Sequence, residues 1–170
     1  MPMNDMTTLS STRGPDRPLL ELTIGGLLER TASRFPDGLA VVSRHQAKRM
    51  TWAELSMAAD RVARGLWSLG VRHSDRVGLW STNCIEWIMM HMGCARAGAA
   101  LVNVNPAYRS HELGYTLTRS QMKVLFLWHK DKRADYEEIL ERARHGLTLE
   151  LAHTIYFDSP EWPALLDAPG

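Results

Sequence analysis

The 170-residue chain has the length of one ordinary domain, and its 45% apolar and 23% charged residues are typical of a globular protein. Its 20 basic and 19 acidic residues give a formal net charge of +1, which excludes a global field that attracts nucleic acid or a membrane surface. No apolar run approaches the roughly 18 residues that span a bilayer, which excludes a transmembrane segment.

The N-terminal residues 1–18 are polar and lack the apolar core of a secretory signal, so we expect a flexible arm followed by one domain over 19–170. Cys84 and Cys94 fall on one predicted helix, about 15 Å apart along its axis, whereas a disulfide needs Cα atoms within about 7 Å. Free thiols fit a reducing, cytoplasmic compartment. The histidines lack paired ligand spacing, so no metal site is predicted.

The first part of the domain predicts two helices separated by two short strands. Thr23 can cap the first helix, and the Thr51-x-x-Glu54 spacing is a capping box that begins the second. The second helix carries an apolar stripe at steps of three and four residues, which we interpret as core rather than as a partner-binding heptad. The expected elements are helix 24–35, strand 39–43, a hairpin-like connection over 45–49 to a strand at 50–51, and helix 52–69.

The stretch 76–109 reads as strand, turn, helix, turn and strand. Val77–Trp80 and 101–104 are short apolar runs, and the helix between them, 84–96, is apolar on nearly every side. Asn83 and Glu86 have the spacing of a reciprocal helix cap. A β-α-β unit within one sheet is almost always parallel and right-handed, and parallel sheets need helices on both faces.

The remaining elements continue this alternation. We expect helix 110–119, strand 123–128, helix 131–144, strand 151–157 and a short helix 162–166. The sequence therefore predicts an α/β fold, namely a doubly wound, mostly parallel sheet flanked by helices.

The sequence contains few patterns that are typical of catalytic or ligand-binding sites. Ligands bind open parallel sheets outside the carboxyl ends of the strands, which directs attention to loops 81–83, 105–109 and 129–131 and to the end of the chain. No glycine-rich phosphate loop and no Gly-x-Ser-x-Gly elbow occurs. The paired carboxylates Glu137 and Glu138 fit the solvated side of a helix. No residue is assigned as catalytic, cofactor-binding or metal-binding.

The turn Asn105–Arg109 is the best candidate for a ligand edge. Two interpretations remain open. In one, the turn contacts a ligand; in the other, Pro106 fixes the turn, Tyr108 packs, and Arg109 caps or pairs locally.

Three ordered motifs resemble the N-terminal part of the AMP-forming acyl-CoA synthetases. They are Thr51-Trp52-x-Glu54-Leu55, the run from Gly70-Val71 to Asp75-Arg76-Val77 (with Ser74 where the family has glycine), and the run from Ala95 to Leu113. The form Asn-Pro-x-Tyr-Arg-x-x-Glu-Leu in the last run is most similar to the fatty-acyl-CoA branch. With the opening helix and strand, the resemblance covers about residues 20–166.

The resemblance implies a parent enzyme that joins a fatty acid to CoA through an acyl-AMP intermediate, with ATP, Mg²⁺ and CoA as cofactors and substrates. The family's ATP-binding loop and catalytic motifs lie downstream of the last match, so no family catalytic residue is carried onto this sequence. We therefore expect an N-terminal fragment of a fatty-acyl-CoA synthetase, truncated before the ATP-binding loop, inactive and without a cofactor of its own.

Whether this chain is itself an enzyme is left open by the sequence. The alternative is a stand-alone α/β binding or interaction module that keeps the ligase scaffold without catalysis. The fragment hypothesis adds that apolar faces meant for absent strands are exposed, giving self-association or a homodimer.

Overall fold

The computed structural model describes residues 14–15, 18–148 and 151–169. The flexible arm predicted for 1–18 falls almost entirely outside these residues and stays a prediction. The described elements follow one another as α1 (Ile24–Arg34), β1 (Leu39–Ser43), β2 (Lys48–Thr51), α2 (Trp52–Ser68), β3 (Arg76–Trp80), α3 (Ile85–Ala97), β4 (Ala100–Val104), α4 (Ser110–Ser120), β5 (Val124–Leu127), α5 (Tyr136–Arg144), β6 (His153–Tyr156) and α6 (Glu161–Leu166). Within these ranges, none of the helices has the length and apolar character needed to cross a bilayer.

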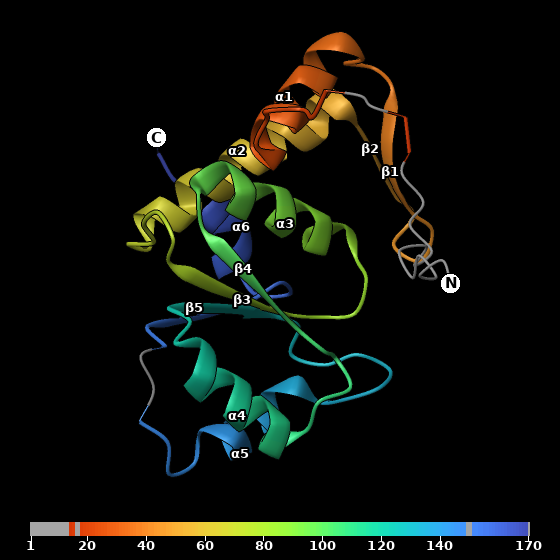
Figure 1. The fold of residues 1–170 in the computed structure, drawn as a ribbon. Coiled ribbons are helices and arrows are strands. Elements are labelled where there is room, and N and C mark those ends of the chain that lie inside the picture. The colour runs from red at the N-terminus through yellow and green to blue at the C-terminus, as the bar shows by residue number, and fades with distance from the viewer. Residues whose placement is uncertain (1–13, 16–17, 149–150, 170) are drawn as a thin grey trace, which may run out of the picture.

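The central sheet has four parallel strands in the order β4-β3-β5-β6. Val77 of β3 lies opposite Leu101 of β4 on one side and Val124 of β5 on the other. Figure 1 shows α2, α3 and α6 over one face of this sheet and α4 and α5 over the other. The doubly wound α/β architecture and the parallel β3-α3-β4 unit are therefore confirmed.

Two hydrophobic clusters fill the layers on either side of the sheet, because successive strand residues point to opposite faces. Val77 and Leu79 belong to the cluster shared with α2, α3 and α6. Trp80 and Leu125 belong to the cluster shared with α4 and α5. Since each face of the sheet is covered, the strands read as continuous apolar runs, as in β5, where all four residues are buried.

The strands β1 and β2 form a separate antiparallel hairpin beside α2 and α3 (Figure 1). A small cluster of Leu28, Leu55 and Ala59 lies under it. The hairpin turn is shorter than the predicted connection 45–49, since β2 already begins at Lys48. Ala47 adopts a positive φ of 52°, and its N–H donates to the carbonyl of Arg44 at 3.2 Å, so the chain reverses within fewer residues.

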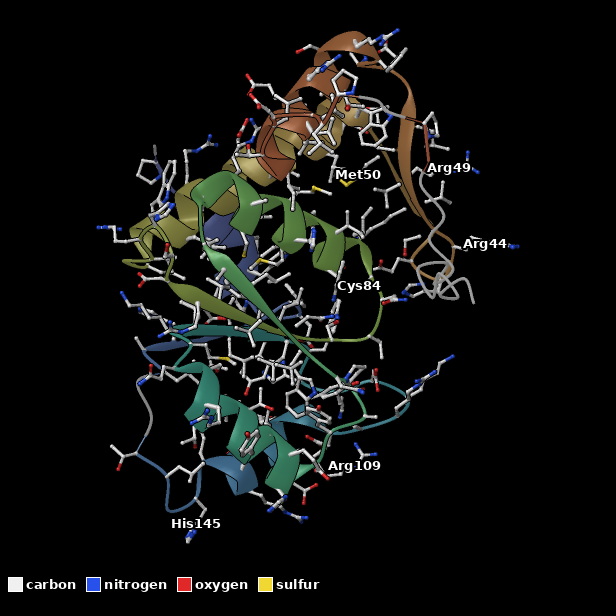
Figure 2. The ribbon with its side chains drawn as sticks, viewed as in Figure 1. Arg44, Arg49, Met50, Cys84, Arg109 and His145 are labelled. Carbon is white, nitrogen blue, oxygen red and sulfur yellow. The ribbon has the colours of Figure 1, made fainter. Side chains whose placement is uncertain are left out.

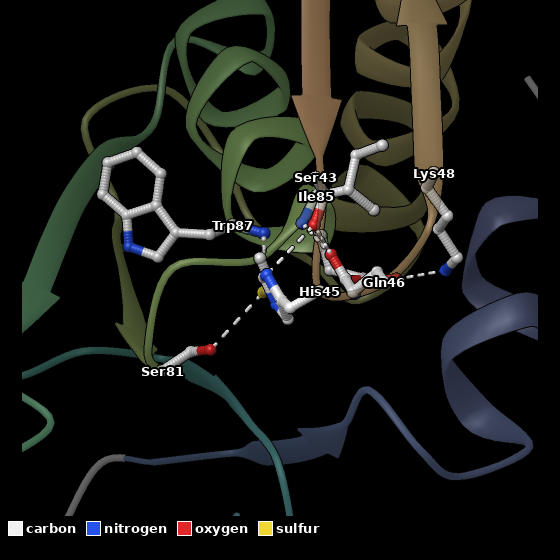
Figure 3. Close-up of polar contacts among 9 residues, drawn as sticks. Ser43, His45, Gln46, Lys48, Ser81, Ile85 and Trp87 are labelled. Carbon is white, nitrogen blue, oxygen red and sulfur yellow. Dashed lines mark hydrogen bonds and ion pairs between the residues drawn. The ribbon is translucent and has the colours of Figure 1, made fainter.

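The predicted reciprocal cap by Asn83 and Glu86 is wrong. The N-cap of α3 is Cys84, whose sulfur accepts from the N–H of Trp87 at 3.4 Å. Glu86 instead accepts from Lys48 Nζ at 2.8 Å and from Gln46 Nε2 at 2.6 Å, both on the hairpin. Figure 3 shows Gln46 and Lys48 of the hairpin beside the start of α3. Glu86 is buried, and a buried carboxylate needs a charged partner and hydrogen bonds, which Lys48 and Gln46 supply.

The helix predicted over 131–144 begins later, at Tyr136, and Asp135 is its N-cap. The preceding residues form a turn because Asp131 Oδ1 accepts the N–H groups of Arg133 at 2.7 Å and Ala134 at 3.1 Å. An aspartate that binds nearby backbone N–H groups in this way competes with helix formation.

Candidate functional site

An open pocket of about 590 Å³ lies at the carboxyl ends of β3 and β4. Such edges are where open parallel sheets bind ligands. The lining side chains are mostly hydroxyls, amides and rings, with a single guanidinium, and they come from the hairpin turn, the β3–α3 loop, the start of α3, the end of β4 and the β5–α5 loop. They belong to His45, Ser81, Thr82, Asn83, Trp87, Asn103, Val104, Asn105, Pro106 and Arg133. Two of the loops named from the sequence, 81–83 and 105–109, therefore meet at this pocket.

Asp131 connects the third predicted loop to the pocket wall. Its Oδ2 accepts from Thr82 Oγ1 at 3.2 Å and from the Tyr136 hydroxyl at 2.9 Å. Burial alone would raise the pKa of Asp131, but these bonds and two backbone N–H donors outweigh it, so the pKa is lowered. A charged Asp131 thus holds the β3–α3 and β5–α5 loops together.

Trp80 extends this network to the β4–α4 loop. Its indole N–H donates to the Asn105 carbonyl at 3.1 Å, and its ring packs edge-on against Tyr136 at 4.8 Å between centroids. Burial, and next the hydrogen bond to Asp131, raise the pKa of Tyr136 to about 12. Three loops at the carboxyl edge are therefore joined through the buried Trp80 and Tyr136 and the half-buried Asp131, which gives the pocket a fixed wall.

The turn Asn105–Arg109 combines both interpretations offered by the sequence. Asn105 and Pro106 line the pocket. Tyr108 packs at the edge of the α4–α5 cluster, and the backbone N–H of Arg109 donates to Glu112 at the start of α4. Only the first half of the turn faces the pocket, while the second half has the structural role.

A second open pocket of about 570 Å³ adjoins the first, since His45, Asn83 and Trp87 line both. Its remaining wall is largely apolar and includes Val41 and Ile88. Cys84 also lines it, but burial raises the pKa of this thiol, and burial raises that of Cys94 to about 12. Both free thiols are buried and protonated, which suits packing rather than nucleophilic attack.

A separate polar pair lies at the carboxyl ends of β5 and β6. His129 Nδ1 lies 2.8 Å from Asp158 Oδ1, and the His129 ring stacks on Tyr156 with 3.7 Å between centroids. The backbone N–H of His129 also donates to Asp158 at 3.3 Å. The pair joins the β5–α5 and β6–α6 loops, and neither residue lines the pocket at β3 and β4.

The carboxyl-edge pocket can hydrogen-bond a polar ligand, but it holds no paired nucleophile and base. Within the described ranges, no group of three or more His, Cys, Asp or Glu side chains could hold a metal ion. Five lining residues lie outside the loops named from the sequence: His45, Trp87, Asn103, Val104 and Arg133. His45 comes from the hairpin turn, which gave no signal of proximity to β4, and Arg133 falls in the turn that had been predicted as helix.

A family profile and similar known proteins agree on one enzyme family. The profile of the AMP-binding enzymes matches residues 28–169. The mitochondrial medium-chain acyl-CoA ligase ACSF2 of Mus musculus is 39% identical over 127 residues, which are 75% of this chain and 21% of the mouse protein. The chain thus spans about a fifth of the length of the curated relatives that it matches.

Solved structures agree with this family. The N-terminal domain of FACL13 from Mycobacterium tuberculosis superposes with a TM-score of 0.76 at 26% identity, covering 88% of this chain and 38% of that one. A long-chain-fatty-acid-CoA ligase, FadD1 of Archaeoglobus fulgidus, gives a TM-score of 0.79 at 20% identity over 95% of this chain and 33% of its own, a likeness of fold alone.

Proposed function

Because this chain belongs to the family of AMP-binding enzymes, we propose that it is the N-terminal part of a fatty-acyl-CoA synthetase and is inactive on its own. The parent reaction joins a fatty acid to CoA with ATP and Mg²⁺. The observation that carries the proposal is the continuous family match over residues 28–169, together with the similarity to the mouse medium-chain acyl-CoA ligase. We take a medium-chain fatty acid as the substrate for the same reason.

The site geometry supports the inactivity. Activation of a carboxylic acid by ATP needs groups that stabilise charge on the transferring phosphoryl group, such as arginine, lysine or a metal ion. The carboxyl-edge pocket has one such group in its lining, Arg133, while its other polar side chains are uncharged at neutral pH or are histidine. In the proposed parent, this pocket supplies hydrogen-bonding groups on one side of the site, and the residues that bind the nucleotide come from downstream segments.

The test is ATP–pyrophosphate exchange. We expect the chain with Mg²⁺, ATP and dodecanoate to give no exchange above a blank without protein. A chimera, in which residues 28–169 replace the matching segment of a fatty-acyl-CoA ligase, should retain exchange with fatty acids. Exchange by the chain alone would overturn the inactivity, and a folded chimera inactive with every fatty acid would overturn the assignment.

A stand-alone binding module is the second candidate, and one observation favours it: helices cover both faces of the parallel sheet, so a core forms within the described residues. Against it stand exposed apolar side chains concentrated at the N-terminal end, where a larger parent would cover them. They include Leu19, Leu20, Leu22, Ile24, Leu27, Phe35, Leu39 and Val42. Light scattering separates the two candidates, since the module should be monodisperse and the fragment should self-associate.

A further inference from the structure

A separate hollow of about 370 Å³ lies between α4 and the end of α5, apart from the carboxyl-edge pocket. Its α4 residues recur at steps of three and four, which places them on one helix face. These are His111, Gly114, Tyr115, Thr118 and Arg119, and Ser110 precedes them at the helix start. The opposite side is formed by Ala143, His145 and Leu147. We call this hollow the α4–α5 groove.

The groove has an apolar floor and two exposed apolar walls. Gly114 forms the floor: a Cβ added there would lie 3.4 Å from both the Ala143 carbonyl and Leu147 Cδ1, so α4 and the end of α5 are in close contact. Tyr115 is 67% exposed and Leu147 is 40% exposed. A ligand between these two side chains would remove their apolar surface from water, which is favourable.

The groove lining has one permanently charged side chain, the guanidinium of Arg119, and two imidazoles. His111, Arg119 and His145 belong to its lining, and the lining contains no carboxylate. Among the described residues, none of the three forms an ion pair. The groove therefore complements a ligand that carries an anionic group and an apolar chain.

We propose that the α4–α5 groove binds a medium-chain fatty acid as its carboxylate. The anionic group contacts Arg119, and the chain lies over Gly114 between Tyr115 and Leu147. A hollow of this volume is in the range of small-molecule sites, roughly 300–1,000 Å³. The choice of a fatty acid among anionic amphiphiles rests on the proposed function. The groove would hold substrate away from the carboxyl-edge pocket.

The experiment is a titration of the isotope-labelled 170-residue chain with dodecanoate below its micelle concentration, followed by amide chemical shifts. We expect saturable shifts at Gly114, Tyr115 and Leu147, and none at Gly93, which is buried between α2 and α3. Arg119→Glu should weaken binding by at least about tenfold, the loss expected for one charge-assisted contact.

The matched control is Arg49→Glu, which makes the same charge change on β2. Figure 2 shows Arg49 and His145 at opposite ends of the molecule. This control should leave the dodecanoate affinity within about twofold, a change of less than about 0.5 kcal/mol. For the apolar wall, Tyr115→Ala should weaken binding, and Trp67→Ala, which removes an exposed aromatic side chain from α2, should not.

Four outcomes would overturn the proposal. Equal losses in the Arg119 and Arg49 variants would mean that only net charge matters, and equal binding of dodecanol would mean that the anion is not recognised. Retention by vesicles of anionic phospholipid without saturable dodecanoate binding would assign the groove to a lipid surface instead. A chimera active with fatty acids, beside a chain that shows no saturable binding, would overturn the groove alone and leave the proposed function standing.

Discussion

Glu86 at the start of α3 accepts a hydrogen bond from Lys48 of β2 across 2.8 Å, although Lys48 is half-exposed and Glu86 is buried. The same carboxylate accepts from Gln46 in the hairpin turn. Gln46 in turn accepts from the backbone N–H of Ile85 at 2.8 Å (Figure 3). These contacts hold the antiparallel hairpin, which is not part of the central sheet, against α3. This helix lines both the carboxyl-edge pocket and the second pocket beside it.

We expect Glu86→Ala to lower the free energy of unfolding by about 2 kcal/mol, because hydrogen bonds to charged groups contribute roughly 1.5–3 kcal/mol each and some are replaced by water. The matched control is Glu138→Ala, which removes an exposed ion pair with Arg142 one turn along α5. That pair should contribute no more than about 0.5 kcal/mol. Urea unfolding of the two variants measures both values, and equal losses would contradict the anchoring role of Glu86.

The Glu86 carboxylate also makes stability depend on pH. Burial alone would raise its pKa, but the bonds from Lys48 and Gln46 outweigh burial, so the pKa in the folded chain lies below the usual 4.5. A lowered pKa contributes stability above the unfolded-state value, and that stability is lost as the pH falls through the folded-state value. The wild-type chain should therefore exceed Glu86→Gln in stability at neutral pH, and the difference should shrink below about pH 4.5.

Urea midpoints of the wild-type chain and Glu86→Gln at a series of pH values test this dependence. The difference between the two proteins isolates Glu86 from the other carboxylates, since those are present in both. A difference that stays constant, or widens, as the solution becomes acidic would contradict the assignment of the lowered pKa to this residue.

Local pattern predicted much of this fold. Leu79 and Val104 fall in the short apolar runs that predicted β3 and β4, and both are buried. The strand order was not available from such patterns, because β5 pairs beside β3 rather than beside its chain neighbour β4. Both β4 and β5 are short, mainly apolar strands, and the polar Asn103 of β4 does not by itself say which strand lies beside β3.

The candidate site was predictable only in part, and for the same reason. Loops 81–83 and 105–109 follow from the rule that ligands bind at the carboxyl ends of parallel strands. His45 reaches the pocket through the contact between the hairpin and α3, which depends on the buried Glu86. Glu86 has the spacing of a local helix cap with Asn83. In the folded chain it is buried against the hairpin and bonds Gln46 and Lys48, about forty residues away in the sequence.

Gly93 sets the closeness of α2 and α3. A Cβ added there would lie 2.2 Å from Val62 Cγ1 and 2.4 Å from Val62 Cβ, too close without movement of one helix. Gly93→Ala should therefore destabilise the chain by about 1–3 kcal/mol, the usual cost of overpacking a core. The control is Gly25→Ala in α1, whose nearest contact would be an ordinary 3.4 Å to the Arg96 backbone.

The control should be neutral or stabilising by up to about 1 kcal/mol, because alanine favours the helix over glycine. Thermal melting with circular dichroism compares the two variants directly. If both substitutions destabilise the chain by a similar amount, then replacing any helical glycine by alanine is unfavourable here. The contact with Val62 would then not explain the result.

The last prediction concerns the network that fixes the wall of the carboxyl-edge pocket. Burial and the hydrogen bond to Asp131 raise the pKa of Tyr136 to about 12. Its neutral hydroxyl therefore stabilises the fold below about pH 10, near the ordinary pKa of tyrosine, and this contribution is lost as the pH rises from about 10 to 12.

Asp131→Asn removes the negative charge and should lower the pKa of Tyr136, although burial keeps that pKa above the ordinary value. Ultraviolet titration of tyrosinate measures the change, with Tyr136→Phe identifying the signal among the four tyrosines. Glu137→Gln is the matched control, because burial and next the Glu137 charge raise the pKa of Tyr156, whereas Glu137 has no part in raising the pKa of Tyr136. If Asp131 holds the loops together, Asp131→Asn should also speed hydrogen exchange at the Trp80 indole N–H, which bonds the Asn105 carbonyl, while Glu137→Gln leaves that exchange unchanged. A lowered Tyr136 pKa with unchanged exchange at Trp80 would mean that Asp131 acts on Tyr136 alone and that the pocket wall is fixed by packing.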